Sequence, residues 1–160
     1  MEAVGGEPKL SAEENIIGLL SKHFNPEAAE IIFNRRFAWM RDDEVTKNIA
    51  SSRGIGQDEA FEWMVLNKPD MKALTEDDVT ETELKSFSKF IQDERRDVLQ
   101  SHTQLKNGLS AHGKNTAGPN MDSELRAWGE KYERVRKASI GIAKKAIQKG
   151  FPVPKYDLVN

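Results

Sequence analysis

Residues 121–150 read MDSELRAWGEKYERVRKASIGIAKKAIQKG, and this stretch decides the fold. Apolar or small side chains recur along it at alternating steps of four and three residues. They are Met121, Leu125, Trp128, Tyr132, Val135, Ser139, Ile142 and Ala146. The spacing predicts a long α-helix with one stripe that packs against a neighbouring helix. Gly150, followed by Pro152, is typical of the residues that end such a helix.

The segment before this helix carries a related pattern. Thr80 and Glu83 have the spacing of a capping box, which predicts that a helix begins there. The seven-residue positions are then Leu84, Ile91, Val98 and Leu105, with Phe87, Glu94 and Ser101 at the alternate positions. A Gly- and Asn-containing loop over residues 106–120 separates the two helices. We therefore predict a long antiparallel helical hairpin over residues 79–150.

The first half of the chain contains shorter helix signals. A second capping box, Ser11 with Glu14, begins one helix, and Asn25 followed by Pro26 begins another. The positions expected to be buried in that second helix are Ala29, Ile32, Phe33, Phe37 and Met40. Gly54 and Gly56 precede a short helix, which Pro69 and the two residues before it end.

The pattern of alternating apolar and polar residues that marks a β-strand is not found, so we predict an all-α fold. A small helical N-terminal subdomain precedes the hairpin. The expected organisation is a flexible tail over 1–10, the helical subdomain over 11–78, the hairpin over 79–150 and an extended tail over 151–160.

The hairpin predicts self-association. Leu, Ile, Val and Phe make up only 36 of 160 residues, so the core is thin, while two helices of about 40 Å are as long as a compact globule is wide. The residues expected in an oligomer interface are Leu84, Phe87, Ile91, Val98, Leu125, Trp128, Tyr132, Val135 and Ile142. Gly129 and Gly141 suggest close helix–helix approach in such an assembly. The alternative is a bundle formed by a single chain.

Residues 46–63, TKNIASSRGIGQDEAFEW, resemble the helix-turn-helix of DNA-binding regulators. In that motif a small residue allows two helices to cross, a glycine forms the turn, and later apolar residues anchor the second helix. The matching positions are Ile49, Ala50, Gly54, Ile55, Ala60 and Trp63. Arg53 departs from the motif, and the acids of the second helix are repelled by phosphate. The resemblance implies DNA binding, and the alternative is a protein-binding or purely structural turn.

Basic residues are concentrated on the last helix. Residues 1–83 carry 18 acids and 9 bases, whereas residues 84–160 carry 8 acids and 15 bases. This asymmetry suggests head-to-tail self-association or an anionic partner for the second half. The alternative is that the two halves are parts of one fold that complement each other. The candidate nucleic-acid-binding residues are Arg134, Lys137, Lys144, Lys145, Lys149, Arg53 and Gln57. The alternative is a solvated face that keeps the protein in solution.

The residue inventory argues against catalysis. The chain has no cysteine, and its three histidines are not placed beside a recognisable nucleophile motif. Runs of adjacent acids, as in residues 42–44 and 76–78, point in different directions on a helix and form poor metal sites. We therefore expect no catalytic residue, no metal, no cofactor and no small-molecule substrate. Neither a signal peptide nor a membrane-spanning run is evident, which predicts a cytoplasmic location or a particle assembled there.

These features together favour a non-enzymatic, nucleic-acid-associated helical oligomer of the assembly, packaging-adaptor or regulatory type. Phage-type DNA-packaging adaptor subunits have a similar layout. The expected partners are further copies of the chain, DNA or RNA, and other protein subunits. The alternative is a structural or adaptor protein whose hairpin and tails bind only other proteins.

Overall fold

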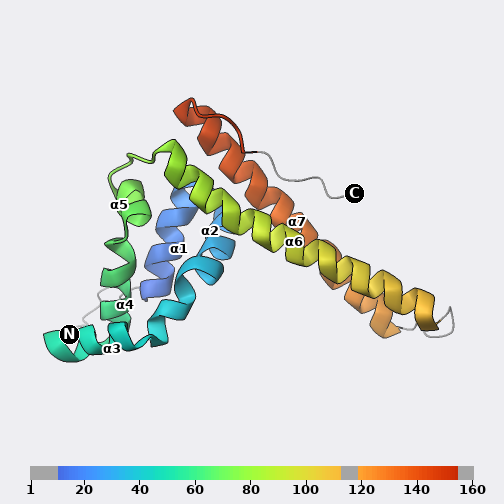
Figure 1. Ribbon diagram of the computed structural model, residues 1–160, viewed down its shortest axis with the longest axis horizontal. Coiled ribbons are helices and arrows are strands. Elements are labelled where there is room, and N and C mark those ends of the chain that lie inside the picture. The colour runs from blue at the N-terminus through green and yellow to red at the C-terminus, as the bar shows by residue number, and fades with distance from the viewer. Residues whose placement is uncertain (1–10, 113–118, 155–160) are drawn as a thin grey trace, which may run out of the picture.

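The computed structural model describes the backbone of residues 11–112 and 119–154, and the side chains of 11–103 and 123–154. Every element in these ranges is helical, which confirms the predicted all-α fold (Figure 1). The α-helices are α1 (Ala12–His23), α2 (Pro26–Ile32), α3 (Glu44–Arg53), α4 (Gln57–Leu66), α5 (Pro69–Thr75), α6 (Glu81–His112) and α7 (Pro119–Lys149). A π-helix, η1 (Phe33–Phe37), and a 3-10 helix, η2 (Ala38–Asp42), follow α2.

The predicted hairpin is confirmed, because α6 and α7 run side by side in opposite directions (Figure 1). With 32 and 31 residues they are about 48 and 46 Å long. The predicted loop over 106–120 is wrong for most of its length, since α6 continues to His112 and α7 begins at Pro119. A single glycine costs a helix about 1 kcal/mol, which α6 tolerates, and proline suits the first helical position. The remaining loop residues lie outside the described ranges.

The predicted helix starts are confirmed by their hydrogen bonds. The Ser11 hydroxyl accepts from the Glu14 amide at 3.2 Å, and the Glu14 carboxylate accepts from the Ser11 amide at 3.0 Å. Thr80 and Glu83 form the same reciprocal pair at 3.2 and 3.0 Å. The side chain of Asn25, the residue just before α2, caps the first turn of that helix. These caps satisfy amides that have no partner within the helix.

The long second helix predicted from Asn25 is divided into α2, η1 and η2, although its five expected buried residues are all in the core. Asp43 then caps α3. The sequence interpretation missed α5, which begins at Pro69, the residue that was expected only to end α4. The predicted tails at 1–10 and 155–160 lie outside the described ranges, while residues 151–154 are not helical.

One hydrophobic core joins the two predicted parts of the chain. Ile16 and Leu20 of α1 belong to the same buried cluster as Phe87 of α6 and Ile142 of α7. In Figure 1, α1 and α2 lie against the part of the hairpin near the start of α6 and the end of α7. The N-terminal helices therefore cover the part of the hairpin's apolar stripe that lies at this end.

This packing corrects the predicted oligomer interface. Six of its nine residues are 4% exposed or less inside the single chain: Leu84, Phe87, Ile91, Val98, Val135 and Ile142. Trp128 and Tyr132 are partly buried against the same core, and Leu125 is of intermediate exposure. These six residues are therefore already buried within a single chain.

Gly141 allows a close approach within the chain rather than between chains. A Cβ at this position would lie 2.5 Å from the Asn25 side chain, which caps α2 and donates from Nδ2 to the Lys137 carbonyl at 2.8 Å. Around Gly129, in contrast, a Cβ would have no neighbour within 4 Å. A close approach is therefore present at Gly141 and absent at Gly129, and it joins α7 to α2 of the same chain rather than to a second copy.

Candidate protein-binding groove

The turn between α3 and α4 sets the direction of α4. Gly54 ends α3 in the left-handed conformation, with φ at 65°, and the Ile55 amide returns to the Ala50 carbonyl at 3.0 Å. A side chain at this φ is strained, so glycine is required there. The predicted turn at Gly54 is thus present as a helix–turn–helix connection.

The two faces of α4 differ from those expected. Ala60, Phe61 and Val65 face the core, whereas Trp63, predicted to anchor this helix, is 40% exposed. The sequence contained a signal for this arrangement, because residues 59, 62, 63 and 66 share one helical face opposite Phe61 and Val65. The helix-turn-helix comparison assigned Trp63 to the wrong face.

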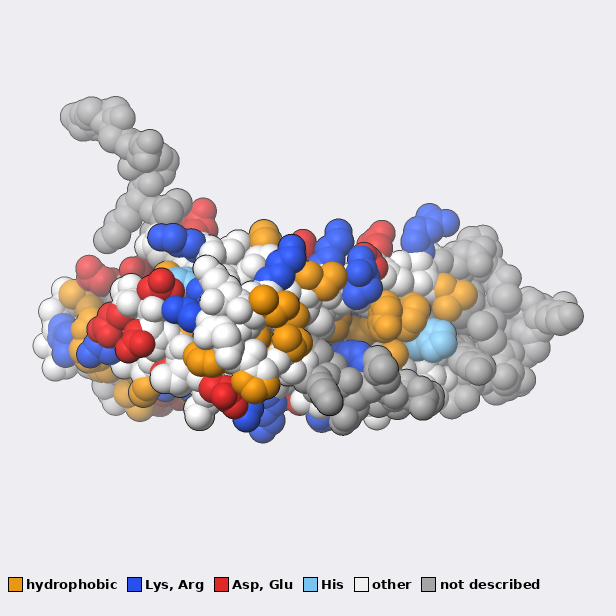
Figure 2. Space-filling view, turned by 90° about the horizontal axis from the view of Figure 1, so that it is seen from above, with side chains coloured by type: hydrophobic (Ala, Val, Ile, Leu, Met, Phe, Trp, Pro, Cys, Tyr) orange, Lys and Arg blue, Asp and Glu red, His pale blue; other side chains and the backbone are white. Residues whose placement is uncertain are grey.

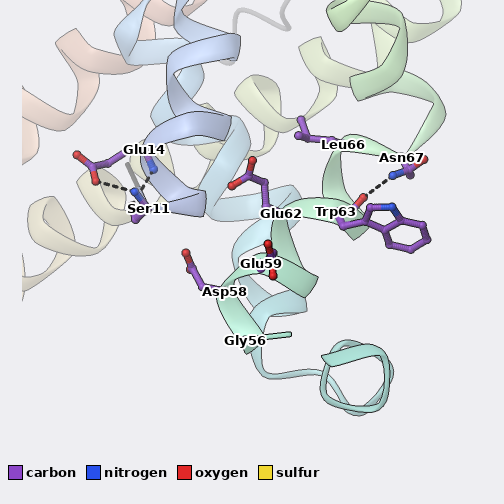
Figure 3. A pocket seen from close by; sticks show the side chains of 9 residues that line it. All are labelled: Ser11, Glu14, Gly56, Asp58, Glu59, Glu62, Trp63, Leu66 and Asn67. Atoms are coloured by element: carbon purple, nitrogen blue, oxygen red, sulfur yellow. Dashed lines mark hydrogen bonds between the residues drawn. The ribbon is translucent and has the colours of Figure 1, made fainter. Parts of the chain in front are cut away.

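The exposed face of α4 and the start of α1 enclose a groove of about 730 Å³ (Figure 3). We call it the acidic groove. Its lining residues are Ser11, Glu14, Gly56, Asp58, Glu59, Glu62, Trp63, Leu66 and Asn67. Figure 3 shows the side chains of Asp58, Glu59 and Glu62 between the start of α1 and the indole of Trp63.

Hydrogen bonds hold several of the groove carboxylates in place. Asp58 accepts from the Ala12 amide at 2.9 Å and pairs with Arg41 at 3.0 Å. Glu62 accepts from the Asn15 side chain at 3.2 Å. Hydrogen bonds from Ser11, its backbone amide first, lower the pKa of Glu14. Asp58, Glu62 and Glu14 are therefore held in position by contacts within the chain.

Apolar surface lies beside these acids. Trp63 presents its indole at one side of the groove, with Leu66 one turn further along α4. The Arg53 guanidinium lies 4.1 Å from the centroid of the Trp63 ring, a cation–π contact. The Trp63 ring thus already has a cationic neighbour within the chain.

The structure does not bring the predicted nucleic-acid-binding residues together. Arg53 and Gln57 lie at the α3–α4 turn, far from the end of α7 (Figure 1). Arg53 contacts Trp63, and Gln57 donates to the Arg41 carbonyl at 2.6 Å and to Asp42 at 3.1 Å. Both predicted residues therefore have partners within the chain.

On α7 the five predicted cations have different surroundings. Lys145 is only 5% exposed, so its assignment to a phosphate-binding surface is corrected. Arg134 pairs with Glu30 at 3.0 Å and with Glu94 at 3.4 Å. Lys149 lies 3.4 Å from an Asp77 carboxylate oxygen. Of the five, only Lys137 and Lys144 are exposed.

Lys145 belongs to a charged cluster that joins three segments. Its ammonium donates to His23 Nδ1 of α1 at 3.0 Å and lies 3.6 Å from Asp77, in the turn before α6. Burial, and then the Lys145 charge, lower the pKa of His23, and Lys22 acts in the same direction. The Asp77 charge and a hydrogen bond to the Leu74 backbone oppose this shift. The charge of Lys149, followed by that of Lys145, lowers the pKa of Asp77.

This cluster predicts a loss of stability in mild acid. The unfolded chain takes up a proton on His23 near its ordinary pKa of 6.5, whereas the folded chain resists protonation. The unfolding free energy should therefore be fully present above that value and should fall as the pH drops below it. Urea unfolding at about pH 7.5 and about pH 5.5 measures the loss. The His23→Gln variant should lose less unfolding free energy than the wild type between these two pH values. Equal losses would show that His23 is not the group responsible.

The described residues contain neither a membrane-spanning helix nor a metal site. None of their helices is long and apolar enough to cross a bilayer. Within the same ranges, no group of three or more His, Asp or Glu side chains is arranged to hold a metal ion. Comparisons with protein-family models, with curated proteins and with solved structures found no match.

Proposed function

We propose that the chain is a non-enzymatic adaptor that binds other proteins through the acidic groove. The observation that carries the proposal is the combination, in one groove, of carboxylates held by hydrogen bonds with exposed Trp63 and partly buried Leu66. A partner segment with Lys or Arg beside large apolar side chains satisfies both kinds of surface. An amphipathic helix that lays one face into a groove is a common form of such recognition.

The charges favour a protein partner over nucleic acid. A surface that binds phosphates presents several free cations together, but three of the five predicted cations of α7 are paired or buried within the chain. The exposed face of α4, which the helix-turn-helix resemblance would insert into DNA, carries Asp58, Glu59 and Glu62. Phosphate repels this face, while a basic peptide is attracted to it.

An NMR titration of the labelled protein tests the proposal. The probe is a synthetic helical peptide of about 18 residues with Lys and Leu on one face, compared with the same peptide carrying Glu in place of Lys. We expect the Lys peptide alone to shift amide signals of α4 and the first turn of α1. Its affinity should fall steeply between low and high salt, because exposed charges are screened.

Glu59→Lys should weaken binding of the Lys peptide at least about tenfold, since it places a cation in the groove. Glu44→Lys is the matched control: both residues are exposed acids in the first turn of a helix, but Glu44 belongs to α3 and lies outside the groove. Equal effects of the two changes, or signal shifts confined to other helices, would contradict the proposal.

A further inference from the structure

We propose that the segment which occupies the acidic groove is the outer face of α7 in a second copy of this chain. The outer stripe of α7 consists of Lys137, Ile140, Lys144 and Ile147. This inference rests on the proposed function, because it names the partner of the same groove.

The outer stripe has the form of a docking helix. Its residues follow at steps of three, four and three, which places them on one face of α7 over about 15 Å. Ile140 is 39% and Ile147 68% exposed, and the two lysines are also exposed. The opposite face of the same helix contributes Val135, Ala138, Ile142 and Ala146 to the core.

Packing within the chain does not explain why Ile140 and Ile147, which alternate with the two stripe lysines, are exposed. Figure 2 shows hydrophobic side chains alternating with Lys and Arg side chains along the middle of this view. Apolar side chains that recur beside cations on one exposed helical face are typical of a surface that binds a partner.

The acidic groove complements the outer stripe in both charge and polarity. Its carboxylates, including those of Glu59 and Glu62, match the two stripe lysines, and Trp63 with Leu66 matches the two isoleucines. The same opposition exists over the whole chain, since residues 1–83 carry 18 acids and 9 bases, whereas residues 84–160 carry 8 acids and 15 bases. Such complementarity steers association and rejects like-charged partners.

The stripe that enters the groove belongs to another copy. In Figure 1, α1 and α2 lie between α4 and the second half of α7, so the stripe of a chain does not reach its own groove. The contact is therefore head-to-tail, with one groove and one stripe used per copy. A head-to-tail contact continues into a ring or a filament, according to whether its rotation closes.

Sedimentation of the full chain over a range of concentrations tests this inference. The stripe variant is Lys137→Glu with Lys144→Glu, and the groove variant is Glu59→Lys with Glu62→Lys. We expect the mass of the wild type to rise with concentration at low salt. In each variant the dissociation constant of this association should rise at least about tenfold. An equimolar mixture of the two variants should regain mass, because the intact groove of one meets the intact stripe of the other.

Lys131→Glu is the matched control, as an exposed lysine on a different face of α7, and should leave the association unchanged. Because Glu62 also accepts from Asn15, Glu59→Lys alone replaces the double change if circular dichroism shows that the groove variant is not folded. A mass of 18.1 kDa for the wild type at every concentration would overturn the inference. So would association that both variants retain, or a mixture that does not regain mass.

The two proposals fail in distinguishable ways. If the wild type stays monomeric while the synthetic Lys peptide still shifts α4 signals, the groove binds proteins and the outer stripe is not its partner. If the peptide does not bind and the variants leave self-association unchanged, both proposals are wrong.

Discussion

Gly141→Ala should destabilise the protein by about 1–3 kcal/mol, while Gly129→Ala should stabilise it by up to about 1 kcal/mol. The same substitution in one helix is thus expected to have opposite effects. Gly129 is in the interior of α7 with no atom within 4 Å of a new Cβ, so alanine there only improves helix propensity.

At Gly141 the gain in propensity is outweighed by a clash. The new Cβ would lie 2.5 Å from Cγ and Nδ2 of Asn25. Asn25 cannot move away without losing its bond to the Ala28 amide at 2.9 Å and its bond to the Lys137 carbonyl at 2.8 Å. The first caps α2 and the second joins α2 to α7, so both the helix start and the helix crossing are weakened.

Urea unfolding monitored by circular dichroism measures both variants. Asn25→Ala in the Gly141→Ala background is an informative third variant, because removal of the clashing amide should recover part of the loss. Stabilisation by Gly141→Ala would show that Asn25 moves at no cost and that α2 and α7 do not depend on this contact.

Trp128→Ala should be more damaging, at about 3 kcal/mol. The Trp128 indole lies between the two helices of the hairpin. Its Nε1 donates to the Val98 carbonyl of α6 at 2.6 Å, and its ring is 4.4 Å from that of His102 and 5.4 Å from that of Tyr132, between centroids. Truncation removes aromatic contacts on both sides together with the hydrogen bond.

Trp63→Ala is the control for this prediction. Trp63 is 40% exposed and its main described ring contact is Arg53, so its removal should cost under about 1 kcal/mol. The two changes separate a structural tryptophan from a binding one, since only Trp63→Ala should weaken binding of the Lys peptide. A loss at Trp128 below that at Trp63 would show that this end of the hairpin contributes little to stability.

The hairpin and most helix starts could be predicted because their signals are local. The steps of four and three in α7 and the caps at Ser11, Asn25 and Thr80 involve residues within one or two turns of each other. Local signals also led to errors where the context was not local. The glycine and asparagine of residues 106–112 suggested a loop, but α6 continues through them.

The sequence by itself determined the two helices of the hairpin with their apolar faces, most of the helix starts, and the division of charge between the two halves of the chain. Tertiary structure alone decided what covers each face. Periodicity predicts an apolar stripe on α6 and α7, but not that α1 and α2 of the same chain bury it. Likewise, Lys145 meets His23, which precedes it by 122 residues, and the acidic groove arises because Gly54 turns α4 toward the start of α1. Such pairings depend on how helices cross in space, whereas sequence spacing specifies only the neighbours along one helix.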